Sequence, residues 1–75
     1  MELDGNRIRA LRLRKVWTQT ELAERADLTE STVNRLERGL QRAHIGTVRK
    51  LASALDVAPG EIVRSYDREE DSASG

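Results

Sequence analysis

The chain has 75 residues, no cysteine and a formal net charge of zero. This length fits one small domain and excludes multi-domain enzymes and repeat arrays. The lack of cysteine excludes disulfide frameworks, thiolate zinc sites and cysteine nucleophiles, and a reducing cytoplasm is the expected compartment. Hydrophobic residues make up 37% of the chain and charged residues 35%, a balance that predicts a charge-rich chain that still folds.

The charges are distributed unevenly along the chain. Residues 6–50 carry eleven basic and five acidic side chains, whereas residues 51–75 carry two basic and six acidic ones. The basic excess of the first segment indicates a polyanion as a partner, because lysine and arginine side chains displace counterions from nucleic-acid phosphates. Ordinary solvated helix surface is the alternative explanation for part of this excess.

Hydrophobic spacing predicts an all-α fold of five short helices, because apolar residues recur at helical intervals and no stretch alternates long enough to form a strand. The predicted helices cover residues 6–15, 19–26, 30–38, 45–55 and 59–66. Residues 1–66 are therefore expected to form one domain. The acidic segment 67–75 offers nothing to bury and is expected to be disordered.

Capping residues mark the ends of these predicted helices. Thr18 and Glu21 match a capping box, in which each side chain accepts a hydrogen bond from the backbone amide of the other residue. Thr29 is suited to cap the next helix, and Gly39 supplies the left-handed residue that ends it. Pro59 occupies the first position of the last helix. The second and third helices are thus expected to meet at a tight turn.

A longer pattern links these helices to a known family. The residues that carry the pattern are Arg12, Gln19, Leu22, Ala23, Val33, Leu36, Glu37, Arg38, Gly39, Thr47, Leu51, Ala52 and Leu55. Over residues 7–63 the chain resembles the phage-repressor helix-turn-helix family of bacterial regulators, also called the Cro-like or xenobiotic-response-element (XRE) family. The resemblance implies a compact five-helix domain like that of lambda repressor, with the helix-turn-helix at the second and third helices.

The same resemblance implies one contact inside the domain. Arg12 and Glu37 are expected to form a buried ion pair between the first and third helices. Such a pair fixes an orientation more surely than it stabilises a fold, and two separate surface charges are the alternative. The chain departs from the family by carrying Val16, Asp27 and Asp56 at positions where glycine is usual.

Side chains on the outer face of the third helix are the candidates for reading bases, because this helix enters the major groove of DNA in such motifs. Arg35 can form two hydrogen bonds to guanine, Asn34 can pair bidentately with adenine, and Glu30 can accept from cytosine. Solvated helix surface is the alternative role for each residue. The candidate base-reading residues are Glu30, Ser31, Thr32, Asn34 and Arg35.

Contacts to phosphates, which set the register on DNA, are expected from polar residues near the helix starts and in the loop after the third helix. For His44, a capping or surface role is the alternative. The candidate phosphate-binding residues are Thr18, Gln19, Thr29, Arg38, Arg42 and His44.

A single helix-turn-helix covers too few base pairs to select a site in a genome, so we expect a homodimer on an inverted-repeat operator. The expected interface lies near the end of the domain, where the apolar content exceeds what a small monomer needs, although ordinary core is the alternative. Its residues are Val57, Ile62, Val63 and Tyr66.

These features predict a sequence-specific regulator that binds double-stranded DNA, in the cytoplasm and associated with the nucleoid. Repression is favoured because no second domain for activation or effector binding is evident. The antitoxin of a toxin–antitoxin pair and a protein-interaction module are the alternatives. An enzyme is not expected, because one histidine, no cysteine and no carboxylate cluster provide no nucleophile and base. No metal or cofactor site is expected either.

Overall fold

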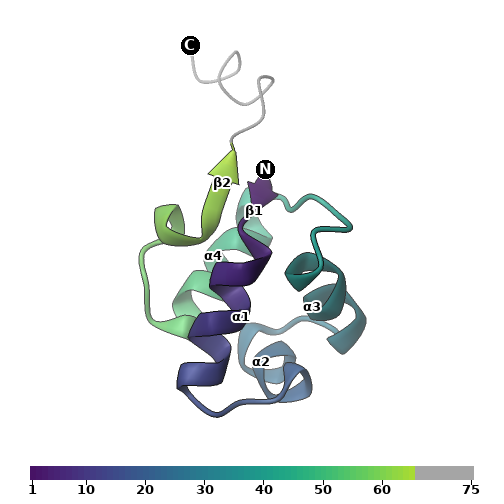
Figure 1. Ribbon diagram of the computed structural model, residues 1–75, viewed down its shortest axis with the longest axis vertical. Helices are drawn as coiled ribbons and strands as arrows, with labels where there is room; N and C mark the ends of the chain where they lie inside the picture. The colour runs from purple at the N-terminus through teal and green to yellow at the C-terminus, as the bar shows by residue number, and fades with distance from the viewer. Residues whose placement is uncertain (66–75) are drawn as a thin grey trace.

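Within residues 1–65, the part of the chain that the structure describes, the computed structural model contains four α-helices, a short 3₁₀ helix and two strands (Figure 1). In chain order the elements are β1 (Glu2–Leu3), α1 (Gly5–Arg14), α2 (Gln19–Ala26), α3 (Glu30–Glu37), α4 (Ile45–Leu55), η1 (Pro59–Ile62) and β2 (Val63–Ser65). The tail expected at residues 67–75 lies outside the described residues. None of the described helices is long and apolar enough to cross a membrane.

The helix starts follow the capping residues. The Thr18 hydroxyl accepts a hydrogen bond from the Glu21 amide at 3.1 Å, and the Glu21 carboxylate accepts one from the Thr18 amide at 3.0 Å, which confirms the capping box. The Thr29 hydroxyl accepts from the Thr32 amide at 3.2 Å, and Gly39 has a φ of 71°. The first four predicted helices are confirmed to within about one residue at each end.

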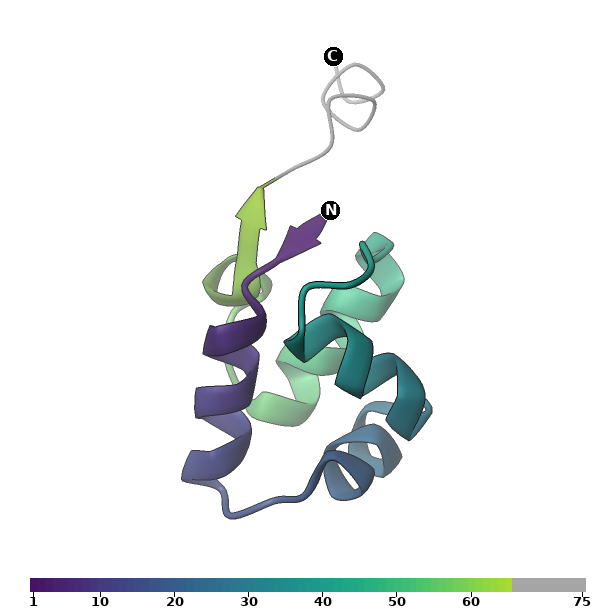
Figure 2. The same cartoon turned by 45° about the vertical axis from the view of Figure 1, so that its right-hand side comes forward.

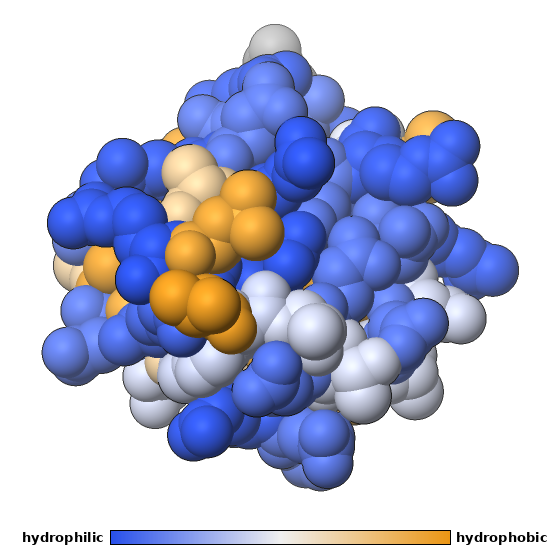
Figure 3. All heavy atoms as spheres, turned by 60° about the horizontal axis from the view of Figure 1, so that its bottom comes forward, coloured by the Kyte–Doolittle hydropathy of each residue, from blue (hydrophilic) through white to orange (hydrophobic). Residues whose placement is uncertain are grey.

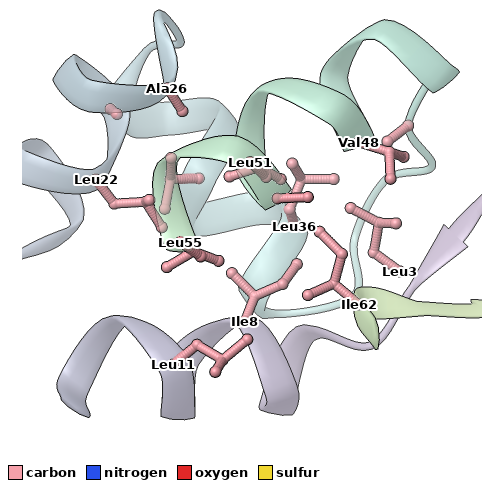
Figure 4. Packing of buried hydrophobic residues seen from close by; sticks show 14 of the residues in the cluster. Leu3, Ile8, Leu11, Leu22, Ala26, Leu36, Val48, Leu51, Leu55 and Ile62 are labelled. Atoms are coloured by element: carbon pink, nitrogen blue, oxygen red, sulfur yellow. The ribbon is translucent and has the colours of Figure 1, made fainter. Parts of the chain in front are cut away.

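Side chains from the four helices, η1 and β1 meet in one core (Figure 4). Ile8, Leu22, Leu36, Leu51 and Ile62 are fully buried there. Helix α2 packs against both α3 and α4, and α1 also contacts α3 (Figure 2). Burial of this apolar surface is the main driving force available to so small a domain.

The prediction of a fifth helix is wrong. Residues 59–62 form η1, and β2 then pairs antiparallel with β1, with Val63 opposite Leu3. The Asp4 amide also donates to the Ile62 carbonyl at 2.9 Å. The β-branched side chains of Ile62 and Val63 favour extended backbone, but the partner strand comes from the other end of the described chain. The fold is therefore mostly helical with a small sheet, rather than five helices.

Gly5 marks a close approach between α1 and α3. A Cβ atom at this position would fall on the carbonyl oxygen of Glu37 and lie 2.7 Å from the carbonyl oxygen of Leu36. Both obstacles are backbone atoms, which cannot rotate out of the way as the end of a long side chain can. Helix α1 begins against the last turn of α3 because residue 5 carries no side chain.

Among the described residues, Val16, Asp27 and Asp56 have a left-handed backbone without being glycine, with φ values of 58°, 56° and 60°. At these three positions the family that the sequence resembles usually has glycine. Aspartate tolerates this region, whereas a β-branched residue is poorly suited to it. The Val16 residue is 86% exposed, so packing does not compensate for the strain of about 1–2 kcal/mol.

Replacing Gly5 by alanine is expected to lower the free energy of unfolding by about 1–3 kcal/mol, because α1 must move away from α3. Urea unfolding followed by circular dichroism would measure the change. Gly46→Ala is the matched control, because a Cβ atom at Gly46 meets nothing within 4 Å and alanine favours a helix. Equal effects of the two substitutions would contradict the close approach at Gly5.

Replacing Val16 by glycine is expected to raise the free energy of unfolding by up to about 1 kcal/mol, because the relief of left-handed strain exceeds the entropic cost of a glycine. Thermal and urea unfolding would both report the gain. The control Val16→Ala removes the branched side chain but keeps a Cβ atom, so most of the strain remains. If Val16→Gly were the less stable of the two variants, the strain would be smaller than the entropic cost.

Candidate nucleic-acid interface

The turn at Asp27 fixes α3 relative to α2. The left-handed Asp27 donates its amide hydrogen to the carbonyl oxygens of Ala23 and Glu24, and the Leu28 amide donates to the Ala23 carbonyl at 2.8 Å. Ala23 is buried in the core, and its helix packs against both α3 and α4. A larger side chain there would displace the packed helices.

A buried ion pair joins α1 to the end of α3. Arg12 Nε donates to Glu37 Oε2 at 2.6 Å, and Arg12 Nη2 donates to Glu37 Oε1 at 2.9 Å. The remaining nitrogen, Nη1, donates to the Trp17 carbonyl at 2.8 Å, just before α2. Arg12 and Glu37 are only 7% and 9% exposed. The hydrogen bonds to Glu37 raise the pKa of Arg12 against the opposing effect of burial, so the guanidinium stays charged.

Gln19 and Asn34 extend this pair toward the outer face of α3. Gln19 Nε2 donates to Glu37 Oε1 at 3.1 Å, and Gln19 Oε1 accepts from Asn34 Nδ2 at 3.2 Å. Both side chains are partly buried. The sequence indicated a phosphate contact for Gln19 and a base contact for Asn34, and gave no sign that the two amides bind each other.

The five candidate base-reading residues all belong to α3 but differ in exposure. Glu30, Ser31 and Arg35 are exposed, whereas Thr32 and Asn34 are half-buried. The Thr32 hydroxyl lies 2.9 Å from that of Thr29. The Glu30 carboxylate accepts a hydrogen bond from the hydroxyl of Thr20 in α2. In Figures 1 and 2 the start of α3 lies away from η1 and β2, whereas Glu37 at its end lines a surface hollow together with Arg64 of β2.

Five of the six candidate phosphate-binding residues are exposed, and Gln19 is the exception. The side chain of His44, the residue that precedes α4, makes no capping hydrogen bond. The first amides of α4 are therefore left without a side-chain cap. The exposed candidates are Thr18, Thr29, Arg38, Arg42 and His44.

Of the residues expected at a dimer interface, Ile62 is fully buried in the core. Val57 and Val63 are half-buried and also pack against the core, and Tyr66 lies outside the described residues. An apolar residue near the end of a domain can serve a core or an interface equally well. Among residues 1–65, the large apolar side chains that are exposed are Leu13, Val16, Leu40 and Ile45.

Figure 3 shows the end of the molecule that lies at the bottom of Figure 1, where α1 leads into α2. Its surface is mostly hydrophilic, with a compact apolar patch left of the centre of the view and smaller apolar areas at the left edge and upper right. Leu13 in the last turn of α1 and Val16, two residues after the helix ends, are both exposed. Within residues 1–65 no group of three or more histidine, cysteine, aspartate or glutamate side chains is arranged to hold a metal ion.

A family model described as "Helix-turn-helix" matches residues 8–62, which include the ion pair and the turn that presents α3. The chain belongs to the XRE-type helix-turn-helix family. Most of the described fold of this XRE-type chain, from α1 to η1, lies inside the match. No curated protein sequence matches the chain.

Solved structures share the fold of this XRE-type domain. The restriction-modification controller protein C.AhdI from Aeromonas hydrophila is 40% identical, with 76% of this chain and 86% of that chain covered and a TM-score of 0.73. The N-terminal DNA-binding domain of SinR from Bacillus subtilis is 35% identical, covering 75% and 83% with a TM-score of 0.71. The P22 c2 repressor in complex with a synthetic operator is 23% identical, covering 85% and 97% with a TM-score of 0.78, a likeness of fold alone.

Removing one partner of the buried pair, as in Arg12→Met or Glu37→Leu, is expected to lower the free energy of unfolding by about 3–5 kcal/mol, because the other charge is left buried and unpaired. The double variant should lose less than the sum of the two single losses, since no charge remains stranded. A double-mutant cycle by urea unfolding measures this coupling. Simple additivity would contradict a direct, buried interaction.

Proposed function

We propose that this chain is a sequence-specific transcriptional regulator that binds double-stranded DNA with α3 in the major groove and acts as a repressor. The observation that carries the proposal is the presentation of α3. Its outer face has exposed polar side chains, Glu30, Ser31 and Arg35, while Glu37 ties the helix to α1 and the turn at Asp27 ties it to α2. Membership of the XRE-type family supports the proposal.

Three side chains supply the chemistry for reading bases. Arg35 is exposed on α3, and its planar guanidinium can donate to both O6 and N7 of guanine. Glu30 uses one carboxylate oxygen for the Thr20 hydroxyl, which leaves the other to accept from cytosine N4. Asn34 keeps one amide hydrogen and its carbonyl oxygen for a base, because it donates a single hydrogen bond to Gln19.

The start of α4 is suited to a phosphate group. Its first amides carry no side-chain cap from His44, and the amides of a helix N-terminus attract anions. Arg38 and Arg42 are exposed in the segment that leads from α3 to this helix. Gln19 contributes less than the sequence indicated, because both ends of its amide already have partners within the domain.

The chain is proposed to act as a homodimer on an inverted repeat. One α3 reads only a few base pairs, and a second copy related by a twofold axis doubles the site. The two half-sites would then lie about one helical turn of DNA apart, roughly 34–36 Å. Ile62 takes no part in the interface, because its side chain fills the core.

Selection of random duplex DNA by the purified chain, followed by sequencing, tests the proposed function. Enrichment of an inverted repeat with half-sites one turn apart would support a dimeric regulator. Titration of the enriched duplex at two salt concentrations would then report the number of phosphates neutralised, because the logarithm of the binding constant falls linearly with that of the salt concentration. A folded chain that enriches no sequence would overturn the proposal and favour an antitoxin or a protein-interaction module.

Arg35→Ala and Arg42→Ala are expected to affect DNA binding in different ways, the first through base preference and the second through overall affinity. Loss of the Arg35 guanidinium should cost about 1–3 kcal/mol of binding free energy and relax the preference at one base pair. Arg42→Ala should weaken binding to every sequence and reduce the slope of the salt dependence by about one. Competition titrations with single-base variants of the selected site would measure both effects.

The control for these two variants is Arg9→Ala. Arg9 is exposed on α1 and belongs to neither the base-reading nor the phosphate-binding candidates. Its removal changes the net charge by the same amount, and both the affinity and the base preference should stay close to those of the unmodified chain. Equal effects of all three substitutions on every duplex would contradict the assigned roles.

A further inference from the structure

Four side chains form one continuous series of hydrogen bonds from the core to the outer face of α3. Arg12 donates to both oxygens of Glu37, at 2.6 and 2.9 Å. Gln19 donates to Glu37 Oε1 at 3.1 Å, and Asn34 donates to Gln19 Oε1 at 3.2 Å. The series begins at a buried charge and ends at a half-buried residue on the helix assigned to the major groove.

The direction of every hydrogen bond in this series is determined by its first member. A guanidinium only donates and an ionised carboxylate only accepts. Glu37 therefore requires the NH₂ group of Gln19, and the Gln19 carbonyl oxygen is left to face Asn34. That oxygen can only accept, so Asn34 in turn must present its own NH₂ group. An amide reversed at either position would bring two acceptors or two donors together, which is costly in a partly buried site.

We propose that Gln19 is a positioning residue that fixes the amide of Asn34 in the orientation that recognises adenine. Bidentate recognition of adenine requires a carbonyl oxygen toward N6 and an N–H toward N7, in a fixed order. With one hydrogen of Nδ2 held by Gln19, Oδ1 and the second hydrogen of Asn34 remain for the base. This inference rests on the proposed function and specifies which residue sets base preference at one position.

The series also explains why the ion pair bears on recognition as well as on stability. An amide in solution interconverts between orientations at little cost, so a base contact made by an unrestrained asparagine must first select one of them. In this protein the Glu37 carboxylate orients the amide of Gln19, and Gln19 in turn orients the amide of Asn34 before any DNA is bound. Pre-organisation of this kind improves discrimination without adding a contact.

The decisive variant is Gln19→Met, which keeps a side chain of similar length and removes both amide groups without changing the charge. The measurement is the preference at each position of the selected site, by competition titration. The unmodified chain is expected to prefer adenine about tenfold at one position, and Asn34→Ala identifies that position by abolishing the preference there. Gln19→Met should reduce the preference severalfold at the same position and leave the other positions unchanged.

A purely structural role for Gln19 predicts a different result, because a general loosening of α3 would weaken binding to all duplexes alike. Gln19→Lys provides a second test that keeps a donor toward Glu37 but removes the acceptor that faces Asn34. It should raise affinity for every duplex through its added charge, yet lose the same adenine preference. Retention of the full preference in either folded variant would overturn the inference.

The hydrogen bond itself can be tested without DNA. In the free protein, NMR spectra of the side-chain amides should show one Asn34 proton shifted by its bond to Gln19, and Gln19→Met should return it to the position of a solvated amide. Identical Asn34 signals in both proteins would overturn the series. An unmodified chain with no base preference would overturn the proposed function and this inference together, whereas a preference that survives Gln19→Met would overturn the inference alone.

Discussion

The position of α3 depends on a single guanidinium. Arg12, in α1, donates hydrogen bonds to the Glu37 carboxylate at the end of α3 and to the Trp17 carbonyl just before α2. One planar guanidinium therefore connects three helices. The rigid geometry of such a bidentate pair specifies an orientation in a way that apolar packing does not. The backbone at Glu37 is fixed as well, because its carbonyl meets the Gly5 end of α1.

This arrangement is suited to a helix that must hold a definite angle in a groove. The two contacts on residue 37 come from positions 5 and 12, which lie about two turns apart along α1. The end of α3 is thus held by a backbone contact near Gly5 and by the ion pair with Arg12. Two contacts at separate points of α1 restrict the rotation of α3 relative to α1. A small core of aliphatic side chains alone would leave this angle less well defined.

The sequence was sufficient for features whose causes are local. The capping box at Thr18 and the left-handed Gly39 depend on neighbouring residues, and they placed the helix ends correctly. The pairing of β2 with β1 depends on residues from opposite ends of the described chain, so the local sequence around Ile62 and Val63 predicts the last turn of a helix instead of a strand. The Gln19–Asn34 hydrogen bond is also non-local. Whether these two side-chain amides meet depends on the angle between α2 and α3, which the sequence pattern does not specify. The family resemblance supplied the Arg12–Glu37 pair, which spacing alone would not have revealed.

The antiparallel pairing of β1 and β2 has a consequence for the order of folding. It joins the two ends of the described chain, and closing so long a loop costs more entropy than forming the neighbouring contacts of α2, α3 and α4. We therefore expect this pairing to form last and to open first, as a local event that leaves the helix-turn-helix assembled. Amide hydrogens of β1 and β2 would then exchange with solvent well before those of α2 and α3.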